Sequence, residues 1–146
     1  SDRFVLSSFA RQMAEIALGL REPVLHVGNL DVARDFSHVD DVIRAYEFAA
    51  LAGESGAAYN VCSGNATTLM DAIESLQAML DTEVNIKIDP ERYRHAEIPE
   101  IRGSHEKLKT RTDWCPVKSF EELMQDLFNY WKTRLQTESE QSNARS

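Results

Sequence analysis

P-V-L-H-V-G-N-L-D-V-A-R-D-F-S-H-V-D-D, residues 23–41, is the stretch around which the rest of the chain is organised. It predicts a short apolar strand at Val24–Val27 that ends at the turn residues Gly28 and Asn29. An irregular turn carrying Arg34 then leads into a helix. An arginine between a glycine turn and the start of a helix can direct its planar guanidinium at an anion. The stretch therefore predicts an anion-binding arrangement centred on Arg34.

Length and composition are those of one soluble globular domain. The chain has 146 residues, of which 42% are hydrophobic and 27% charged, and its formal net charge is −8. Because nucleic acid and anionic membranes require a basic face, we expect neither as a partner. No apolar run approaches the ~18 residues of a membrane span, and the N-terminal sequence does not have a signal-peptide pattern. We therefore expect a cytoplasmic protein.

The cysteines and the N-terminal sequence support two further expectations. Cys62 and Cys115 are too few and too far apart in sequence for a disulfide framework or a zinc site, so we expect both to be reduced and buried. The apolar residues Phe4, Val5 and Leu6 follow after only three residues, with no methionine before them. We therefore expect the chain to be part of a longer protein.

Helical and strand patterns alternate up to residue 88. The elements expected are a helix from Ser7 or Ser8 to Gly19, the strand Val24–Val27, a helix over residues 39–51 opened by Asp40, a strand over 57–61, a helix opened by Thr68 and Asp71, and a half-buried strand over 84–88. In the helix over 39–51, Val42, Ile43, Tyr46 and Ala49 or Ala50 are expected to face inward. This order predicts an α/β fold, a small mixed sheet with packed helices.

The last third of the chain begins with an irregular segment. Residues 91–103 have no regular pattern and carry many charges, which favours a loop packed on the domain. Ser104 can cap a short helix, and Ser119 with Glu122 forms a capping box for the last helix. Beyond that helix the sequence is polar, and we expect it to be frayed. The boundaries expected are 1–132 for the domain and 133–146 for a polar flexible tail.

Sequence motifs assign no reaction to the chain. It contains no G-x-S-x-G, H-E-x-x-H, G-x-G-x-x-G or G-x-x-x-x-G-K-[ST] segment, and its histidines have no partner at metal-ligand spacing, so we expect no metal site. An anionic, hydroxyl-rich ligand would suit what remains. Arg34 and Arg94 can each grip phosphate oxygens by two hydrogen bonds, and Glu97 can accept both hydroxyls of a ribose. The structural alternative is an ion pair of Arg34 with Asp35 and a solvated loop at 94–97.

Five segments carry a resemblance to a known family. They are R-D-F-S-H-V-D-D-V at 34–42, A-Y-N-V-C-S-G at 58–64, D-P-E-R-Y-R-H-A-E-I-P at 89–99, G-S-H-E-K-L at 103–108 and W-C-P at 114–116. The chain resembles the C-terminal, substrate-binding portion of Rossmann-type extended short-chain dehydrogenases, the NAD-dependent epimerase/dehydratase family that acts on nucleotide sugars. The nearest resemblance is to GDP-6-deoxy-4-keto-D-mannose reductases, which form GDP-rhamnose in deoxysugar biosynthesis. GDP-mannose 4,6-dehydratases come next.

The resemblance implies a set of substrate contacts. It places Arg34 and Arg94 at the diphosphate, Glu97 at the ribose hydroxyls, Phe4 and Val5 by the guanine, and Gly28 and Asn29 in the wall beside the sugar nucleotide. In the family, position 95 is usually proline and position 104 usually aspartate, whereas this chain has His95 and Ser104. His95 would loosen the loop that carries Arg94, while Ser104 would still cap a helix.

The resemblance also implies a cofactor that this chain does not hold by itself. In the family, NAD(P) is bound mainly by an N-terminal Rossmann half that carries a Tyr-x-x-x-Lys pair. No tyrosine here is followed by lysine at that spacing, so we expect no catalytic or cofactor-binding residue in this chain. The complete enzyme would include that half, bind NAD(P) and a GDP-sugar, and form a homo-oligomer. The alternatives are a dehydratase, or a non-catalytic module that binds nucleotide sugars.

Overall fold

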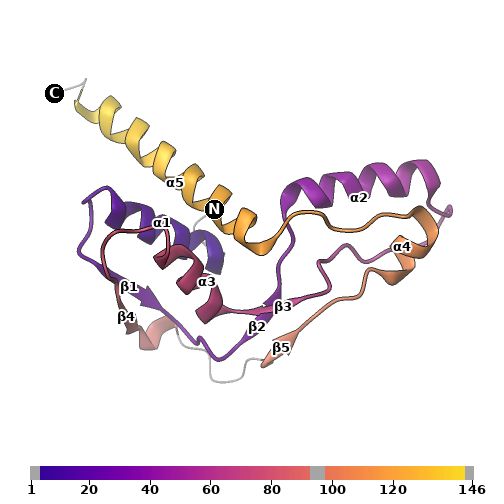
Figure 1. Cartoon of the computed structure of the whole chain (residues 1–146), viewed down its shortest axis with the longest axis horizontal. Coiled ribbons are helices and arrows are strands. Elements are labelled where there is room, and N and C mark those ends of the chain that lie inside the picture. The colour runs from indigo at the N-terminus through magenta and orange to yellow at the C-terminus, as the bar shows by residue number, and fades with distance from the viewer. Residues whose placement is uncertain (1–3, 93–97, 144–146) are drawn as a thin grey trace. The chain divides into compact units, whose positions relative to one another are not determined.

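The computed structural model describes residues 4–92 and 98–143 (Figure 1). Its elements are α1 (Val5–Ala17), β1 (Val24–Val27), β2 (Ala33–Asp35), α2 (Val39–Ala52), β3 (Ala66–Thr68), α3 (Leu69–Gln77), β4 (Asn85–Ile88), the 3-10 helix η1 (Pro90–Arg92), β5 (Glu100–Ile101), α4 (Glu106–Thr112) and α5 (Phe120–Asn143). Small sheets combined with helices confirm the predicted α/β class. Within the described ranges, no helix is long and apolar enough to cross a membrane.

Contacts divide the chain into two compact units, whereas its length predicts one domain. Unit 1 consists of residues 1–31, 69–97 and 124–146, and unit 2 consists of residues 32–68 and 98–123. Unit 1 contains α1, α3, β1, β4 and most of α5. Unit 2 contains α2, α4 and the strands β2, β3 and β5.

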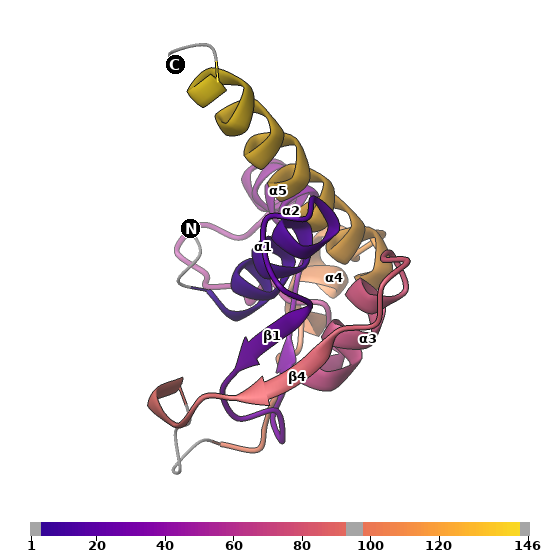
Figure 2. The same cartoon turned by 90° about the vertical axis from the view of Figure 1, so that its left-hand side faces the viewer.

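Unit 1 is built on a parallel strand pair, β1 and β4, which lie side by side in Figure 2. Leu25 and Val27 on one face of β1 are fully buried, and α1 packs against this strand. All four residues of β4 are exposed, including Ile86 and Ile88. The predicted strand is therefore present, but its predicted half-burial was wrong, because the contacts with α1 are made through β1.

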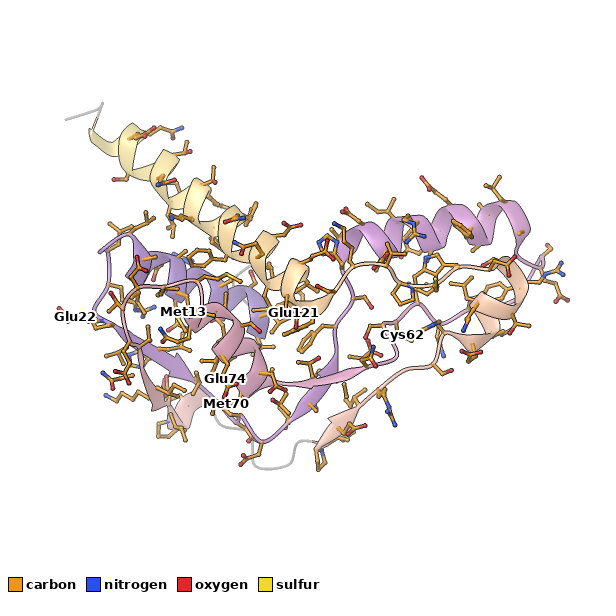
Figure 3. All side chains as sticks on the ribbon, in the orientation of Figure 1. Met13, Glu22, Cys62, Met70, Glu74 and Glu121 are labelled. Carbon is orange, nitrogen blue, oxygen red and sulfur yellow. The ribbon has the colours of Figure 1, made fainter. Side chains whose placement is uncertain are left out.

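Helix α1 docks on β1 through an apolar face and one buried amide. The buried apolar residues of α1 recur at helical spacing: Leu6, Phe9, Ala10, Met13, Ala14 and Ile16, with Met13 labelled in Figure 3. Gln12 is 5% exposed, and its amide accepts from the backbone N–H of His26 at 3.0 Å and donates to the carbonyl of His26 at 3.1 Å. The amide thereby supplies hydrogen-bond partners to the N–H and carbonyl of His26, which lie on the edge of β1 that faces away from β4.

The start of α1 differs from the prediction, and its end agrees. The helix begins directly after Phe4, so Ser7 and Ser8 lie within it and do not cap it. Ser7 instead accepts a hydrogen bond at 3.0 Å from the indole N–H of Trp131 in α5. Gly19, with φ of +68°, follows the helix in the left-handed conformation that glycine adopts without strain.

Helix α5 begins with the predicted capping box and extends beyond the predicted end. The N–H of Ser119 donates to Glu122 Oε2 at 2.8 Å, and the N–H of Glu122 donates to Ser119 Oγ at 3.1 Å. The helix continues to Asn143, through the segment for which the sequence predicts a frayed tail. Leu135 in this segment is only 8% exposed, one turn past the buried Trp131. The apolar face of α5 therefore extends into the polar segment.

Unit 2 contains a three-stranded sheet in the order β3-β2-β5. β2 is antiparallel to β3, where Arg34 pairs with Thr67, and parallel to β5, where Arg34 pairs with Ile101. Arg34 thus lies on the central strand, whereas the sequence predicts an irregular turn. The prediction was wrong because both partner strands lie far along the chain, and the residues around Arg34 do not indicate such pairing.

Helix α2 begins where predicted, but it buries a different face. Asp41 and Ala45 are its buried residues, whereas Ile43 is 51% exposed and Tyr46 is 68% exposed. Ala45 packs with Leu108 and Trp114 in a cluster that we call the Trp114 cluster. The prediction was therefore wrong for Ile43 and Tyr46, whereas the predicted Ala49 does pack against this cluster, and the buried face includes a carboxylate.

His38, and not Asp40, is the N-cap of α2. Its Nδ1 accepts from the backbone N–H of Asp40 at 3.2 Å. Asp40 and Asp41 then occupy the first turn, where negative charge interacts favourably with the helix dipole. The sequence therefore located the start of this helix correctly, but the N-cap lies two residues before the predicted Asp40.

Residues 57–61 form no strand among the described residues, although the sequence predicts one. Tyr59 and Val61 nevertheless pack against the Trp114 cluster, in keeping with the alternation that led to the prediction. The carbonyl of Ala58 accepts from Lys107 Nζ at 2.9 Å. The segment is thus held by its side chains and by a lysine, and the described chain supplies it with no strand partner.

Candidate functional site

Arg34 lies at the centre of β2, and its guanidinium is anchored to the backbone. Nη1 donates to the carbonyl oxygens of Ala33 and Ile98, both at 2.8 Å. These two bonds occupy both hydrogens of Nη1. Because Ile98 stands just before β5, the guanidinium connects β2 to the segment that leads into its neighbouring strand.

The described residues leave the other edge of this guanidinium open. Within residues 4–92 and 98–143, the Nε and Nη2 donors of Arg34 have no hydrogen-bond partner. Nε and Nη2 form the fork with which arginine holds two oxygens of one phosphate or carboxylate. An arginine held at Nη1 and open at Nε and Nη2 can bind an anion while losing little side-chain freedom.

Asp35 does not form the ion pair with Arg34 that the structural alternative requires. Its Oδ1 accepts from the N–H and the hydroxyl of Ser63, at 2.8 and 2.6 Å, and its Oδ2 accepts from the N–H groups of Gly64 and Gly103, at 2.9 and 3.2 Å. Side chains of consecutive strand residues point to opposite faces of the sheet. The described contacts therefore favour a binding role for Arg34 over a local ion pair.

Cys62, labelled in Figure 3, is buried beside this carboxylate. Burial raises the pKa of the Cys62 thiol, the negative charge of Asp35 raises it further, and the N–H of Gly64 acts in the opposite direction. The thiol is therefore kept protonated and is a poor nucleophile. Both cysteines are free, as predicted, but Cys115 is exposed, so the prediction that both are buried was wrong for Cys115.

The predicted residues of unit 1 lie at the ends of two elements. Gly28 and Asn29 follow β1 directly, and Asn29 Oδ1 accepts from the N–H of Asp31 at 2.9 Å to form a turn. Phe4 is 73% exposed at the start of α1, and Val5 is half-buried in its first turn. The roles expected for these residues beside the guanine and the sugar stay predictions.

Arg94, His95 and Glu97 lie outside the described residues, so their expected roles also stay predictions. The described chain resumes at Ile98, the residue whose carbonyl anchors Arg34. Further along, Ser104 Oγ accepts from the N–H of Glu106 at 3.4 Å, but the N-cap of α4 is His105, one residue after the Ser104 that the sequence predicts.

The sequence did not predict that two carboxylates accept hydrogen bonds from several backbone N–H groups. Asp35 does so around the Arg34 strand, and Asp41 accepts from the N–H groups of Val117 and Lys118 at 3.1 and 2.9 Å. Both residues belong to the stretch at residues 23–41, but a carboxylate that binds distant backbone has the same local sequence as a solvated one. The described residues contain no group of three metal-ligating side chains.

Comparisons with known proteins agree on one family. The model of the family described as GDP-mannose 4,6 dehydratase matches residues 1–127. A GDP-6-deoxy-D-mannose reductase from Pseudomonas aeruginosa is 40% identical over 137 residues, which cover 94% of this chain and 45% of the reductase. A GDP-mannose 4,6-dehydratase from Sordaria araneosa is 27% identical over 143 residues, which cover 85% of this chain and 26% of the dehydratase.

A solved structure agrees with these sequences. The structure of RMD from Pseudomonas aeruginosa in complex with NADPH matches this chain with a TM-score of 0.86 and 39% identity, over 92% of this chain and 44% of that protein. The predicted fold and the predicted resemblance, to the reductases first and the dehydratases next, are thereby confirmed. The chain spans less than half the length of each of these relatives.

Proposed function

Because this chain belongs to the GDP-mannose 4,6-dehydratase family, we propose that it is the substrate-binding part of an NAD(P)-dependent reductase that converts GDP-4-keto-6-deoxy-mannose to GDP-rhamnose. Identity of 40% to a reductase, against 27% to a dehydratase, supports the reductase over the dehydratase. The reductase is more than twice as long as the part of it that matches this chain. The proposal therefore concerns only the contribution of this chain to substrate binding. A cytoplasmic, homo-oligomeric enzyme belongs to the same proposal.

The observation that carries the proposal is the anchored, half-open guanidinium of Arg34. A chain with a net charge of −8 does not attract an anion by its overall field, so a diphosphate must be held by local cations. Arg34 supplies such a cation in a fixed direction. In the proposed site Arg94 is the second cation, and Glu97 accepts the ribose hydroxyls.

The proposed role is orientation of the substrate. The nicotinamide cofactor supplies the hydride when it is bound, and the similar Pseudomonas protein was solved with NADPH. Since this chain has neither a glycine-rich phosphate loop nor a Tyr-x-x-x-Lys pair, its residues do not fit that cofactor, and we assign them no step of hydride transfer. A diphosphate held in one place fixes the sugar relative to the reacting groups, which lowers the entropic cost of the reaction.

Calorimetric titration of the chain with GDP tests the proposal. Arg34→Ala is expected to weaken GDP binding by about 10- to 100-fold, because a charged two-point contact is lost. Arg34→Lys is expected to restore only part of the affinity, since an ammonium lacks the planar fork. Arg111→Ala removes an exposed arginine of α4 in the same unit and serves as the matched control for lost charge.

A second ligand separates the contributions to binding. Guanosine, which has no phosphate, is expected to bind much more weakly than GDP, and Arg34→Ala is expected to leave its affinity unchanged. If guanosine and GDP bind equally, or if Arg34→Ala and Arg94→Ala both bind GDP like the unmodified chain, the assignment of the diphosphate to these arginines is wrong. If Arg111→Ala weakens GDP binding to the same degree as Arg34→Ala, the loss of affinity is explained by the change in net charge alone.

A further inference from the structure

One carboxylate holds both strands that flank β2. Ser63 and Gly64 stand at the entry to β3, and Gly103 stands just after β5. The bonds from these residues to Asp35 therefore join the last residue of β2 to the chain on either side of it. In Figure 1 the three strands lie next to one another in the order that their pairing gives.

The sheet depends on these bonds because its strands are short. β3 has three residues and β5 has two, so the backbone ladders on both sides of β2 contain few hydrogen bonds. Hydrogen bonds to an ionised carboxylate are about twice as strong as those between neutral groups. The bond between Asp35 and the N–H of Gly103 therefore contributes substantially to the placement of the segment around β5.

Glycine is required where this segment meets Cys62. A Cβ added to Gly103 would lie 2.7 Å from Cys62 Sγ and 2.9 Å from Cys62 Cβ, closer than real Cβ contacts. Gly64, the other glycine bound to Asp35, has φ of +83°. Both glycines thus allow the backbone to come close enough for its N–H groups to reach the carboxylate.

The same segment holds the second anchor of Arg34. Ile98 precedes β5 by two residues, and its carbonyl accepts one of the two Nη1 bonds of the guanidinium. Moving the β5 segment away from β2 would remove this acceptor and leave the guanidinium with the carbonyl of its neighbour Ala33. Asp35 thus influences the direction of Arg34 without touching it, from the opposite face of the strand.

We propose that Asp35 is the positioning residue of the Arg34 site: it holds the β5 segment against β2, which keeps the Ile98 carbonyl in place and the Nε and Nη2 edge of Arg34 presented to an anion. The proposal rests on the proposed function of Arg34 as a holder of the diphosphate. Asp35 itself contacts no ligand in this arrangement. Its effect on binding is therefore transmitted entirely through Arg34.

A double-mutant cycle with GDP as the ligand tests this dependence. Asp35→Asn places an amide NH2 where an oxygen now accepts from backbone N–H groups, and we expect GDP to bind about tenfold more weakly. In Arg34→Ala the same change at Asp35 is expected to have no further effect, because there is no guanidinium left to position. Asp41→Asn is the matched control, a carboxylate of the same unit that also binds backbone N–H groups, and its GDP affinity is expected to stay unchanged. Equal affinity in Asp35→Asn and the unmodified chain, or additive losses in the double variant, would overturn the proposal.

A measurement without ligand separates this proposal from the proposed function. In nitrogen-15 NMR spectra, the Nη1 hydrogens of Arg34 are expected to give signals distinct from those of Nη2, because two carbonyls restrain rotation of the guanidinium. Asp35→Asn should average these signals, and Asp41→Asn should preserve them.

If Arg34→Ala leaves GDP binding unchanged, the proposed function fails while the NMR result still decides the role of Asp35. If the Arg34 signals are the same in Asp35→Asn as in the unmodified chain, the positioning role is refuted. Ser63→Ala, which removes one bond to Asp35, gives a milder variant if Asp35→Asn unfolds.

Discussion

The indole N–H of Trp114 donates to the backbone carbonyl of Asp41 at 3.2 Å, between residues 73 positions apart in the sequence. Trp114 is 1% exposed and packs with Ala45 and Leu108 in the Trp114 cluster. The ring of His105 meets it edge-on, with ring centroids 5.4 Å apart. The bond therefore ties the segment after α4 to the first turn of α2, and unit 2 should be sensitive to its loss.

Trp114→Phe is expected to lower the free energy of unfolding by about 1–3 kcal/mol, because a buried hydrogen bond is lost and the smaller ring leaves a void. Urea unfolding followed by far-ultraviolet circular dichroism measures the change. Lys109→Ala on α4 is the control, since among the described residues the exposed side chain of Lys109 makes only a surface ion pair at 3.7 Å with Glu106. An unfolding midpoint equal to that of the unmodified chain would show that the indole bond contributes nothing.

Gly103→Ala is expected to destabilise the chain by about 1–3 kcal/mol, because the new methyl group would overlap Cys62 Sγ, 2.7 Å away. Adding Cys62→Ala removes the sulfur and should recover part of the loss, although the remaining Cβ is still close. Gly56→Ala is a useful comparison, since open space surrounds that position and only its positive φ opposes the change. Thermal unfolding of these three variants and the unmodified chain checks the ranking. No recovery in the double variant would mean that the sulfur is not the obstacle.

The buried thiol of Cys62 should make the chain less stable in alkaline solution. Its pKa is raised by burial and by Asp35. At a pH above the ordinary cysteine pKa, the unfolded chain has released this proton while the folded chain still holds it, so the free energy of unfolding falls as pH rises. Urea midpoints between about pH 7 and 10 should fall less in Cys62→Ala than in the unmodified chain. Cys115→Ala, at the exposed cysteine, should keep the full decline, and an equal decline in Cys62→Ala would contradict the assignment.

The capping box of α5 should depend on pH in acid. The pKa of Glu122 is lowered, first by the N–H of Ser119 and then by the side chain of Lys118. The stabilisation is therefore present above the ordinary glutamate pKa and is lost as pH falls through the lowered pKa. Helix content measured by circular dichroism should decline in acid more in the unmodified chain than in Glu122→Gln. The neighbouring Glu121→Gln, at a position labelled in Figure 3, should retain the decline.

Local signals predicted the parts of the fold that depend on neighbouring residues. The Ser119 and Glu122 capping box is such a case, because both hydrogen bonds lie within four residues of chain and the sequence specifies both partners. The end of α1 at Gly19 is another. Arg34 was also singled out locally, because its residue type and flanking turn signals are visible without any structure, and its role in anion binding stays a prediction.

Features that depend on distant partners were out of reach of the sequence. Arg34 was placed in a turn because the strands that pair with β2 lie around Thr67 and Ile101. On α2 the apolar Ile43 and Tyr46 gave the wrong face, since the burial of Asp41 is compensated by N–H groups 76 and 77 residues away. A carboxylate inside a core is favourable only when such donors are present, and the sequence does not show where they come from.

The division of the chain into two units has a consequence for its synthesis on the ribosome. The chain passes from one unit to the other between residues 31 and 32, 68 and 69, 97 and 98, and 123 and 124. Unit 2 therefore has all its residues once position 123 has emerged, while unit 1, which starts first, still waits for the buried Met124, Phe128 and Trp131 of α5. Domains that are continuous in sequence tend to fold from the N-terminus onward as they emerge. Here the order is reversed, because α1 is synthesised before unit 2 but obtains its contact with Trp131 of α5 only after the last residue of unit 2.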